Sequence, residues 1–303
     1  MRRKYYTLDV FTDVALAGNP LAVVRDAEGL DTARMQQIAR EFNLSETVFV
    51  LPPRDPVNTA RIRIFTPTRE LPFAGHPTVG AAILIAELDA PDLLSREDLM
   101  VVLEEDIGAV SCTVRHMKGR APRASFSLPR LPERAGEARD PATIAAALGL
   151  SPSDIGFDAH EPSVFSAGNP FTFVPLASLD AIRRAQPRFP AWAEAFGAME
   201  RPAAFLYTRE TEKPGHALHA RMFAPGLGIG EDPATGSAVA ALAGVLMSYE
   251  EPIDGSYGFI IEQGFEMGRP SLITLGMEIE NGLLVEGSIG GCAVIVQRGV
   301  IEL

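Results

Sequence analysis

Two stretches of similar design constrain how this chain can fold more than any other feature. Residues 65–82 read FTPTRELPFAGHPTVGAA, and residues 223–241 read FAPGLGIGEDPATGSAVAA. Each passes from an extended Phe-x-Pro segment, through a turn rich in Gly and Pro, into a run of small apolar residues. We predict helices over residues 79–86 and 238–247. They carry almost no charge on any face, so they should be buried, and both are too short to span a membrane.

The order of features in the first half of the chain recurs in the second half. Gly-Asn-Pro turns stand at residues 18–20 and 168–170, which are 150 positions apart, and residues 74–82 align with residues 233–241 at a spacing of 159. Two features in one order at nearly one offset indicate a duplication, because a solenoid would repeat over a far shorter period. We therefore predict an α+β fold in which strands wrap around one central helix, twice over.

The boundary between the halves falls in residues 119–142, which are rich in Arg, Pro and Ala and lack sustained periodicity. A chain of 303 residues is long enough for two domains that each bury a core. We predict a first domain of residues 1–120 with a C-terminal strand near residues 288–303, and a second domain of residues 121–287. Two predicted helices run from the N-cap Asp31 through Phe42 and over residues 180–199. Two predicted strands lie within residues 100–114, and more strands follow residue 255. The other predicted strands cover residues 6–10, 21–24, 47–51, 61–65, 124–128, 203–207 and 220–223.

Charge, cysteine content and missing motifs exclude several classes of function. The 27 basic and 39 acidic residues give a formal net charge of −12, whereas a nucleic-acid site needs clustered Lys and Arg. The two cysteines, Cys112 and Cys292, are too far apart to indicate a disulfide framework or a zinc site. No phosphate loop, His-Glu-x-x-His pair, serine elbow or signal-peptide core is present. We expect a cytoplasmic protein with no metal, membrane or nucleic-acid partner.

The turns before the two central helices suit the binding of a carboxylate. The first N–H groups of a helix have no partner within it, and the helix dipole favours an anion there. Small residues let such a ligand approach the backbone, namely Gly75 in the first turn and Thr235, Gly236 and Ser237 in the second. Gly and Pro also punctuate loops that have no function, so the residues alone leave both interpretations open.

Three side chains near these turns are candidates for proton transfer. His76 lies in the first turn, and its imidazole has a pKa near neutrality, although a single histidine in a turn is more often solvated or a cap. Asp232 precedes the second helix, where capping is the commoner role. Glu46 stands at the entrance of a predicted strand, where desolvation would raise its pKa above roughly 4.3, although most such glutamates are solvated. The other histidines have no comparable setting: His116, His160, His216 and His219.

At these residues the chain resembles the PhzF-like family of phenazine biosynthesis proteins, a branch of the diaminopimelate epimerase-like superfamily. The resemblance covers nearly the whole chain and does not depend on a single motif. The segments that carry it are DVF at 9–11, GNPLAVV at 18–24, NLSETVF at 43–49, RIFTP at 63–67, ELPFAGHP at 70–77, GEDPATGSA at 230–238, QG at 263–264 and MGRPS at 267–271.

The resemblance implies two similar domains, each a mostly antiparallel barrel around a central helix, with the active site in the cleft between them. It also implies a homodimer that uses no cofactor. It assigns the proton-transferring acid/base to Glu46, with His76 and Asp232 assisting at the substrate, in place of the commoner roles that the residues alone favoured. The residues predicted to bind a small carboxylate substrate are Ser45, Gly75, Thr235, Gly236, Ser237 and Asn19.

One comparison within the superfamily bears on the reaction class. Its epimerases and proline racemase-like enzymes carry a Cys in each turn, and Ala74 and Pro233 match those places here. Neither residue can move a proton, so a single carboxylate remains to take a proton from one carbon and return it to another. We predict isomerisation of a small carboxylated metabolite, as in the family's isomerisation of trans-2,3-dihydro-3-hydroxyanthranilate. An epimerase with a second acid/base and a non-catalytic metabolite-binding protein are the alternatives.

Overall fold

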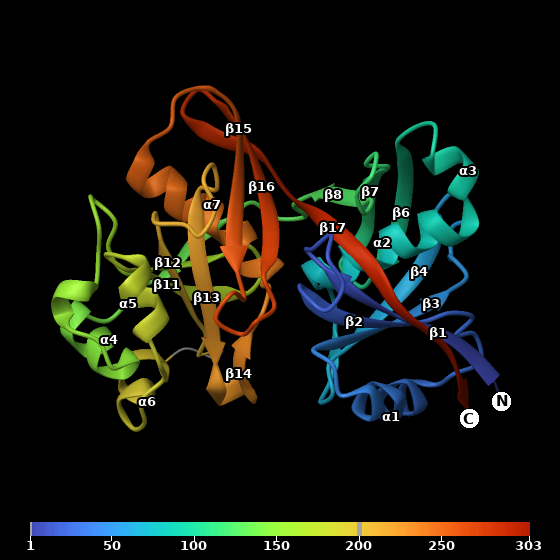
Figure 1. Cartoon of the computed structure of the whole chain (residues 1–303), viewed down its shortest axis with the longest axis horizontal. Helices are drawn as coiled ribbons and strands as arrows, with labels where there is room; N and C mark the ends of the chain where they lie inside the picture. The colour runs from blue at the N-terminus through green and yellow to red at the C-terminus, as the bar shows by residue number, and fades with distance from the viewer. Residues whose placement is uncertain (1, 199–201) are drawn as a thin grey trace. The chain divides into compact units, whose positions relative to one another are not determined.

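The computed structural model describes residues 2–198 and 202–303 and has a mixed α+β architecture (Figure 1). The chain divides into two compact units, each of which is described by itself. Unit 1 comprises Met1–Pro129 and Gly290–Leu303, and unit 2 comprises Arg130–Ile289. Met199, the predicted end of one helical region, lies outside the described residues.

Unit 1 contains a β-barrel. Its strands are β1 (Arg2–Val10), β2 (Asn19–Val24), β3 (Glu46–Leu51), β4 (Ala60–Phe65), β5 (Glu70–Leu71), β6 (Leu99–Glu105), β7 (Gly108–Arg115), β8 (Arg123–Ser127) and the last part of β17 (Leu283–Glu302). The pairs β2–β3 and β4–β6 are parallel, and β1–β2, β3–β4, β6–β7 and β7–β8 are antiparallel. Strand β17 pairs with both β8 and β1 and so closes the ring, while β5 pairs with β4 outside it.

Helix α2 (Gly75–Asp89) fills this barrel and contacts strands β1, β2, β3, β6, β7 and β8 (Figure 1). All its residues from Gly75 to Ala86 are buried, as expected for a helix without a polar face. Gly80 permits the close approach, because a Cβ there would lie 2.6 Å from Cδ2 of Leu21 and 2.8 Å from Cγ2 of Val10. A short helix, α3 (Pro91–Leu94), follows α2.

Helix α1 (Thr32–Phe42) packs on the barrel strands through one apolar face that includes Met35 and Ile38. The side chain of Asp31 caps it by accepting a hydrogen bond from the N–H of Arg34. Asn43 ends it in a left-handed conformation with φ of 50°. These observations confirm the predicted helix and both of its ends.

Unit 2 repeats the strand pairing of unit 1. The antiparallel pairs β10–β11, β12–β13, β13–β14 and β15–β16 correspond in turn to β1–β2, β3–β4, β4–β5 and β6–β7 of unit 1. The parallel pairs β11–β12 and β13–β15 correspond to β2–β3 and β4–β6. Helix α7 contacts β9, β10, β11 and β16. The elements are β9 (Glu133–Gly136), α4 (Pro141–Leu148), η1 (Pro152–Asp154), β10 (Ser163–Ser166), β11 (Pro170–Pro175), α5 (Leu179–Arg184), α6 (Ala191–Phe196), β12 (Ala204–Thr208), β13 (Leu218–Ala224), η2 (Pro225–Leu227), β14 (Ile229–Asp232), α7 (Gly236–Glu250), β15 (Gly255–Gln263) and β16 (Ser271–Glu280).

The duplication extends to a carboxylate that holds a loop in each unit. In unit 1, Glu104 on β6 accepts hydrogen bonds from the backbone N–H groups of Arg54 and Asp55, both at 2.8 Å, and from Nδ2 of Asn58 at 3.0 Å. We call this arrangement the carboxylate clamp of unit 1. It ties the loop between β3 and β4 to the end of β6.

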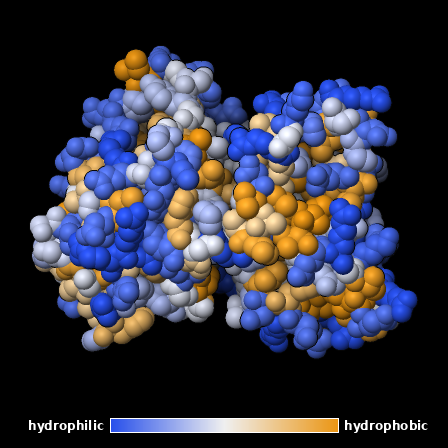
Figure 2. Space-filling view, viewed as in Figure 1, coloured by the Kyte–Doolittle hydropathy of each residue, from blue (hydrophilic) through white to orange (hydrophobic). Residues whose placement is uncertain are grey.

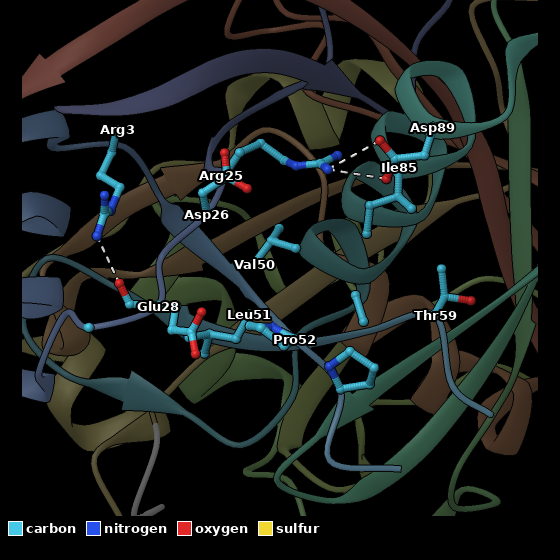
Figure 3. A pocket seen from close by; sticks show the side chains of 13 residues that line it. Arg3, Arg25, Asp26, Glu28, Val50, Leu51, Pro52, Thr59, Ile85 and Asp89 are labelled. Carbon is cyan, nitrogen blue, oxygen red and sulfur yellow. Dashed lines mark hydrogen bonds and ion pairs between the residues drawn. The ribbon is translucent and has the colours of Figure 1, made fainter. Parts of the chain in front are cut away.

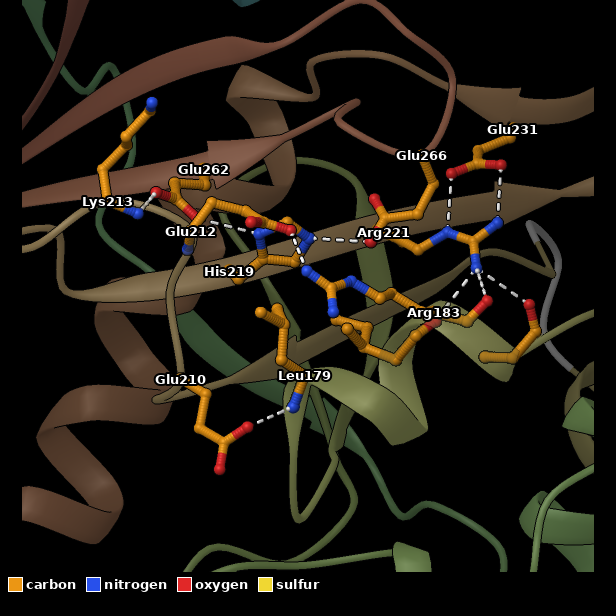
Figure 4. Close-up of polar contacts among 12 residues, drawn as sticks. Leu179, Arg183, Glu210, Glu212, Lys213, His219, Arg221, Glu231, Glu262 and Glu266 are labelled. Atoms are coloured by element: carbon orange, nitrogen blue, oxygen red, sulfur yellow. Dashed lines mark hydrogen bonds and ion pairs between the residues drawn. The ribbon is translucent and has the colours of Figure 1, made fainter.

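Unit 2 contains the same carboxylate clamp at an offset of 158 residues. Glu262 on β15 accepts from the backbone N–H groups of Glu212 and Lys213, at 2.8 and 2.9 Å, and contacts Nδ1 of His216 at 2.7 Å (Figure 4). Each of these residues stands 158 positions after its counterpart in unit 1. A repeat that keeps loop, side chain and strand together is strong support for duplication.

The structure corrects several predictions about local elements. Both central helices begin earlier than predicted, at Gly75 and Gly236, because the Gly-rich turns themselves adopt helical backbone. Pro77 is tolerated there, since the first N–H groups of a helix have no partner to lose. Asp232 does not cap α7, whose N-cap is Thr235, and instead ends β14. The helices α3 and α4 and the short strands β5, β9, β10 and β14 were not predicted.

Hydrophilic residues cover much of the face shown in Figure 2. Apolar residues gather over unit 1, in the region where Figure 1 shows β17 and β2. Exposed apolar side chains of unit 1 include Leu16, between β1 and β2, and Val300 on β17.

Candidate active site

The predicted acid/base, Glu46, is the first residue of β3 and follows the bend that ends α1. Its side chain is 16% exposed, so water reaches only part of the carboxylate. Glu46 lies opposite Leu21 in the parallel pair β2–β3. Asn19, which is fully buried, stands two residues before Leu21, and Ser45 stands one residue before Glu46. The fold therefore brings Asn19, Ser45 and Glu46 to the same end of two neighbouring strands.

His76 lies beside Glu46. It is the second residue of α2, its side chain is 7% exposed, and its Nε2 is 3.3 Å from Oε2 of Glu46. This separation is just beyond the usual range for a hydrogen bond between nitrogen and oxygen, and such contacts often shorten when substrate binds. Burial lowers the pKa of His76 to about 3, so the imidazole is neutral at physiological pH. A neutral imidazole can donate a hydrogen bond to a carboxylate through its N–H, or accept one from a carboxylic acid through its other ring nitrogen.

The start of α2 provides hydrogen-bond donors at the same place. No side chain caps this end of the helix, and Gly75 is buried in its first turn. The leading N–H groups have no partner within the helix, and together with the dipole they favour an anion. Glu46, His76 and the amide groups of this turn thus form one compact group in unit 1.

The remaining predicted residues come together in unit 2. Asp232 ends β14, Thr235 is the N-cap of α7, and Gly236 and Ser237 are the first residues of that helix. The hydroxyl of Thr235 lies 2.5 Å from Oδ2 of Asp232, to which it donates its proton. No side chain caps the start of α7, so here too the first N–H groups point out of the helix.

Gln263, at the end of β15, holds this turn in place. Its side chain is buried, its Oε1 accepts from the N–H of Thr235 at 2.9 Å, and its Nε2 donates to the carbonyl of Asp232 at 2.8 Å and to Oγ1 of Thr235 at 2.9 Å. Because Oγ1 of Thr235 receives this bond, its own proton is directed to Asp232. Gln263 belongs to a segment that resembles the family, but the sequence did not reveal its role, because Thr235 is 28 positions away.

Two other buried groups were also missed. Glu105, at the end of β6, is buried beside Thr78 of α2, and burial raises its pKa to about 8, which outweighs the lowering effect of its hydrogen bond with Thr78. In unit 2, the ring nitrogens of His219 lie 2.8 Å from Glu262 and 3.0 Å from Glu266 (Figure 4). Burial by itself lowers the pKa of His219, but its bonds to these carboxylates outweigh burial and raise the pKa to about 9. His219 is therefore an imidazolium between two glutamates.

A pocket of about 500 Å³ in unit 1 lies away from the predicted residues (Figure 3). It includes Ile85 and Asp89, near the end of α2, whereas His76 lies at its start. Arg25 donates to both carboxylate oxygens of Asp89 at 3.1 Å, and a guanidinium nitrogen of Arg3 donates to the carbonyl of Glu28 at 2.8 Å. Nε of Arg3 and Nη1 of Arg25 are buried without a hydrogen-bond partner among the described residues.

Among residues 2–198 and 202–303, no group of three or more His, Cys, Asp or Glu side chains is arranged to hold a metal ion. Within the same ranges no helix has both the length and the apolar character needed to cross a membrane.

Comparisons with known proteins cover nearly the whole chain. The family described as phenazine biosynthesis-like protein (PhzC-PhzF) matches residues 8–299. An uncharacterised isomerase of Mesorhizobium japonicum is 50% identical over 98% of this chain and 98% of its own length. The trans-2,3-dihydro-3-hydroxyanthranilate isomerase of Pseudomonas fluorescens is 36% identical over 99% of each protein.

Solved structures agree with this assignment. A PhzF family phenazine biosynthesis protein from Bacillus anthracis is similar with a TM-score of 0.89 and 26% identity over 100% of both chains. A hydroxyproline epimerase from Agrobacterium vitis has a TM-score of 0.66 at 12% identity over 99% of this chain and 92% of its own, which shows a shared fold alone. The chain therefore belongs to the PhzC-PhzF phenazine biosynthesis-like family and is an isomerase of the PhzF type.

Proposed function

We propose that this protein is a cofactor-independent isomerase that moves a proton within a small carboxylated metabolite, with Glu46 as the acid/base. The observation that carries the proposal is the contact between Oε2 of Glu46 and Nε2 of His76 at 3.3 Å, with both side chains largely buried. A partly buried carboxylate beside a neutral imidazole is a suitable pair for general acid–base catalysis, which contributes about 10²–10⁴ in rate.

In the proposed reaction, the Glu46 carboxylate removes a proton from one carbon of a conjugated substrate. The electron pair of that C–H bond moves into the conjugated system, and the negative charge spreads toward the substrate carboxylate. The amide groups at the start of α2 stabilise this charge. Glu46, now protonated, returns the proton to a second carbon, so atoms and charge balance without a cofactor. His76, which is uncharged, positions the carboxyl group of Glu46.

The proposal keeps the other residues that the resemblance assigned to the substrate. Asp232 orients a polar group of the substrate, and its carboxylate is held ready by the Thr235 hydroxyl. Gly236 and Ser237 offer backbone donors at the uncapped start of α7. In the same way, Ser45, Gly75 and Asn19 are proposed as substrate contacts.

The name of the relative in Pseudomonas fluorescens suggests a first substrate to test. Trans-2,3-dihydro-3-hydroxyanthranilate has a carboxylate next to a conjugated ring, which is the chemistry that the proposed mechanism requires. We propose a carboxylated metabolite of this class as the substrate.

The test replaces Glu46 with Gln. Glu46→Gln keeps the shape of the side chain and removes the acid/base, so turnover of trans-2,3-dihydro-3-hydroxyanthranilate should fall by about 10²–10⁴ while the far-UV circular dichroism stays unchanged. In D₂O, product formed before Glu46 exchanges its proton with solvent should keep the substrate's own hydrogen, and exchange at Glu46 should place deuterium at the newly protonated carbon. The control is Glu41→Gln, an equal change of charge on an exposed residue of α1, which should keep wild-type turnover. Wild-type turnover in Glu46→Gln would rule the mechanism out.

Three broader predictions belong to the same proposal. We propose that the strands of unit 2 wrap α7 in a second barrel, as its repeated pairing suggests, and that the protein is a homodimer in the cytoplasm. Light scattering of the purified protein measures the mass of the assembly directly.

A further inference from the structure

Glu105 is a buried acid that the proposed mechanism does not use. It is the last residue of β6, and its Oε1 lies 2.8 Å from Oγ1 of Thr78. Thr78 is two positions after His76 in the first turns of α2. The contact therefore joins Glu105 to the turn that presents Gly75 and His76.

The hydrogen bonds of Thr78 show which protonation state of Glu105 fits this turn. Oγ1 of Thr78 is 2.8 Å from the carbonyl oxygen of Ala74 and 2.8 Å from Oε1 of Glu105, but a hydroxyl has one proton to donate. The Ala74 carbonyl can only accept. Both contacts are hydrogen bonds if Thr78 donates to Ala74 while a protonated Glu105 donates to Thr78. If Glu105 is ionised, one of the two contacts brings lone pairs together.

The surroundings of Glu105 favour the same neutral form. Its Oε2 is buried and has no hydrogen-bond partner within the described residues, and an ionised carboxylate with a dry, unpaired oxygen is costly. Burial accordingly raises the pKa of Glu105 to about 8. Within the described residues no ion pair joins Glu105 to an arginine. The charged or titratable groups that line the same pocket of about 220 Å³, or face Glu105 from β7, are Arg54, Arg61, Arg63, Glu70, Glu104, Asp106 and Cys112.

Several of these neighbours are already engaged. Arg63 is bound to both oxygens of Glu70 at 2.6 Å, and Glu104 holds backbone N–H groups in its clamp. Burial raises the pKa of Cys112 to about 12, so its thiol stays neutral beside Glu105. The immediate surroundings therefore change little in charge while Glu105 titrates.

We propose that Glu105 is a positioning residue for the site around Glu46 and His76, a role that rests on the proposed function. As a neutral carboxylic acid it donates to Thr78, which leaves the Thr78 hydroxyl free to bind the carbonyl of Ala74, the N-cap of α2. This pair of bonds holds the first turn of the helix. When Glu105 loses its proton it no longer donates to Thr78, so the Glu105–Thr78 and Thr78–Ala74 contacts cannot both be hydrogen bonds. The first turn of α2, which places His76 against Glu46, is then held less firmly.

The second unit offers an independent parallel. Gln263 is the last residue of β15, as Glu105 is of β6, and it directly follows the clamp residue Glu262, as Glu105 follows Glu104. Its amide holds the start of α7 through Thr235. An amide donates at every pH, whereas a carboxyl group donates only when it is protonated.

Spectroscopy tests the role without a substrate. In infrared difference spectra of wild type minus Glu105→Gln, a carboxylic acid C=O band should be present at neutral pH and disappear with a midpoint near pH 8. In NMR spectra of the wild type, the amide resonances of Gly75, His76 and Thr78 should shift with the same midpoint, and in Glu105→Gln they should not. If Glu105→Gln does not fold, the wild-type amides decide, since resonances that stay fixed through this range overturn the proposal.

Activity provides the second readout. With trans-2,3-dihydro-3-hydroxyanthranilate as the probe, wild-type kcat should fall as Glu105 loses its proton. Glu105→Gln should move this alkaline decline by about one pH unit or more, since its amide still donates. Thr78→Ser keeps the hydroxyl and should keep the wild-type profile. An unchanged decline in folded Glu105→Gln overturns the role of Glu105. No turnover by the wild type would contradict the proposed function instead, and the spectra would still decide on Glu105.

Discussion

Units 1 and 2 share one arrangement of strands, clamped loop and central helix, but they carry different functional groups at one equivalent position. In each unit, a glutamate near the end of a strand clamps a loop, and the next residue reaches the start of the central helix. That next residue is Glu105 in unit 1 and Gln263 in unit 2. The shared arrangement therefore determines where this side chain lies. Its functional group, a carboxyl in Glu105 and an amide in Gln263, determines whether its hydrogen bond to the central helix depends on pH.

The clamps themselves differ in their surroundings. Hydrogen bonds from Asn58 and from the backbone lower the pKa of Glu104 to about 2. Glu262 is fully buried and also binds the imidazolium of His219 at 2.8 Å. In unit 2 the clamp glutamate also forms a buried ion pair, whereas among the described residues of unit 1 no such pair involves Glu104, and this difference predicts unequal stabilities.

The largest expected effect comes from replacing the two clamp residues in turn. Glu262→Gln removes the charge that pairs with His219 and places an NH₂ group against backbone N–H donors, so it should lower the free energy of unfolding by about 3–5 kcal/mol. Glu104→Gln disturbs the same backbone contacts without a buried histidine and should lower it less. Urea unfolding of both variants measures the difference. Equal losses would show that the ion pair adds nothing to the clamp.

A smaller effect is expected from pH. Folded Glu105 keeps its proton from pH 4.5 to about 8, and folded His219 keeps its proton from pH 6.5 to about 9, after the unfolded chain has lost each one. Stability should therefore fall as pH rises, by about 1.4 kcal/mol per pH unit for each group. Between pH 7 and 8 both contribute, and Glu105→Gln should halve the slope. A slope that Glu105→Gln leaves unchanged would mean that Glu105 is already ionised in this range.

The third prediction concerns the glycines that let each central helix approach its strands. A Cβ at Gly244 would lie 2.6 Å from the ring of Phe165, whereas at Gly80 it would meet the ends of the Leu21 and Val10 side chains. Each change to Ala should lower the free energy of unfolding by about 1–3 kcal/mol. Gly244→Ala should lower it more, because a rigid aromatic ring moves aside less easily than the end of an aliphatic side chain.

Thermal unfolding measures both glycine variants. The control is Gly258→Ala, where an added Cβ meets nothing within 4 Å, and it should leave stability nearly unchanged. If Gly80→Ala proves the costlier change, the packing of α2 is the tighter of the two.

Local signals made much of the element order predictable. Helix α1 was predicted with both of its ends, because Asp31 caps it and Asn43 accepts a left-handed backbone. The starts of α2 and α7 were predicted too late, since Gly and Pro in a turn and in the first turn of a helix look alike in sequence. Glu46 and His76 were candidates from the sequence, their roles were assigned by the resemblance, and no spacing rule could have shown that these two side chains touch.

By itself, the sequence determined that two uncharged helices must be buried, that the chain is duplicated, and which residues match a family motif. These follow from composition and from the order of residues, which can be read along the chain without knowing which segments meet in space. Only the tertiary structure decided which polar groups are buried away from water and which have hydrogen-bond or ionic partners. Thr78 meets Glu105 across 27 positions, and His219 meets Glu262 across 43. Protonation depends on burial and on such distant partners, so the chemistry of these groups is a property of the folded chain.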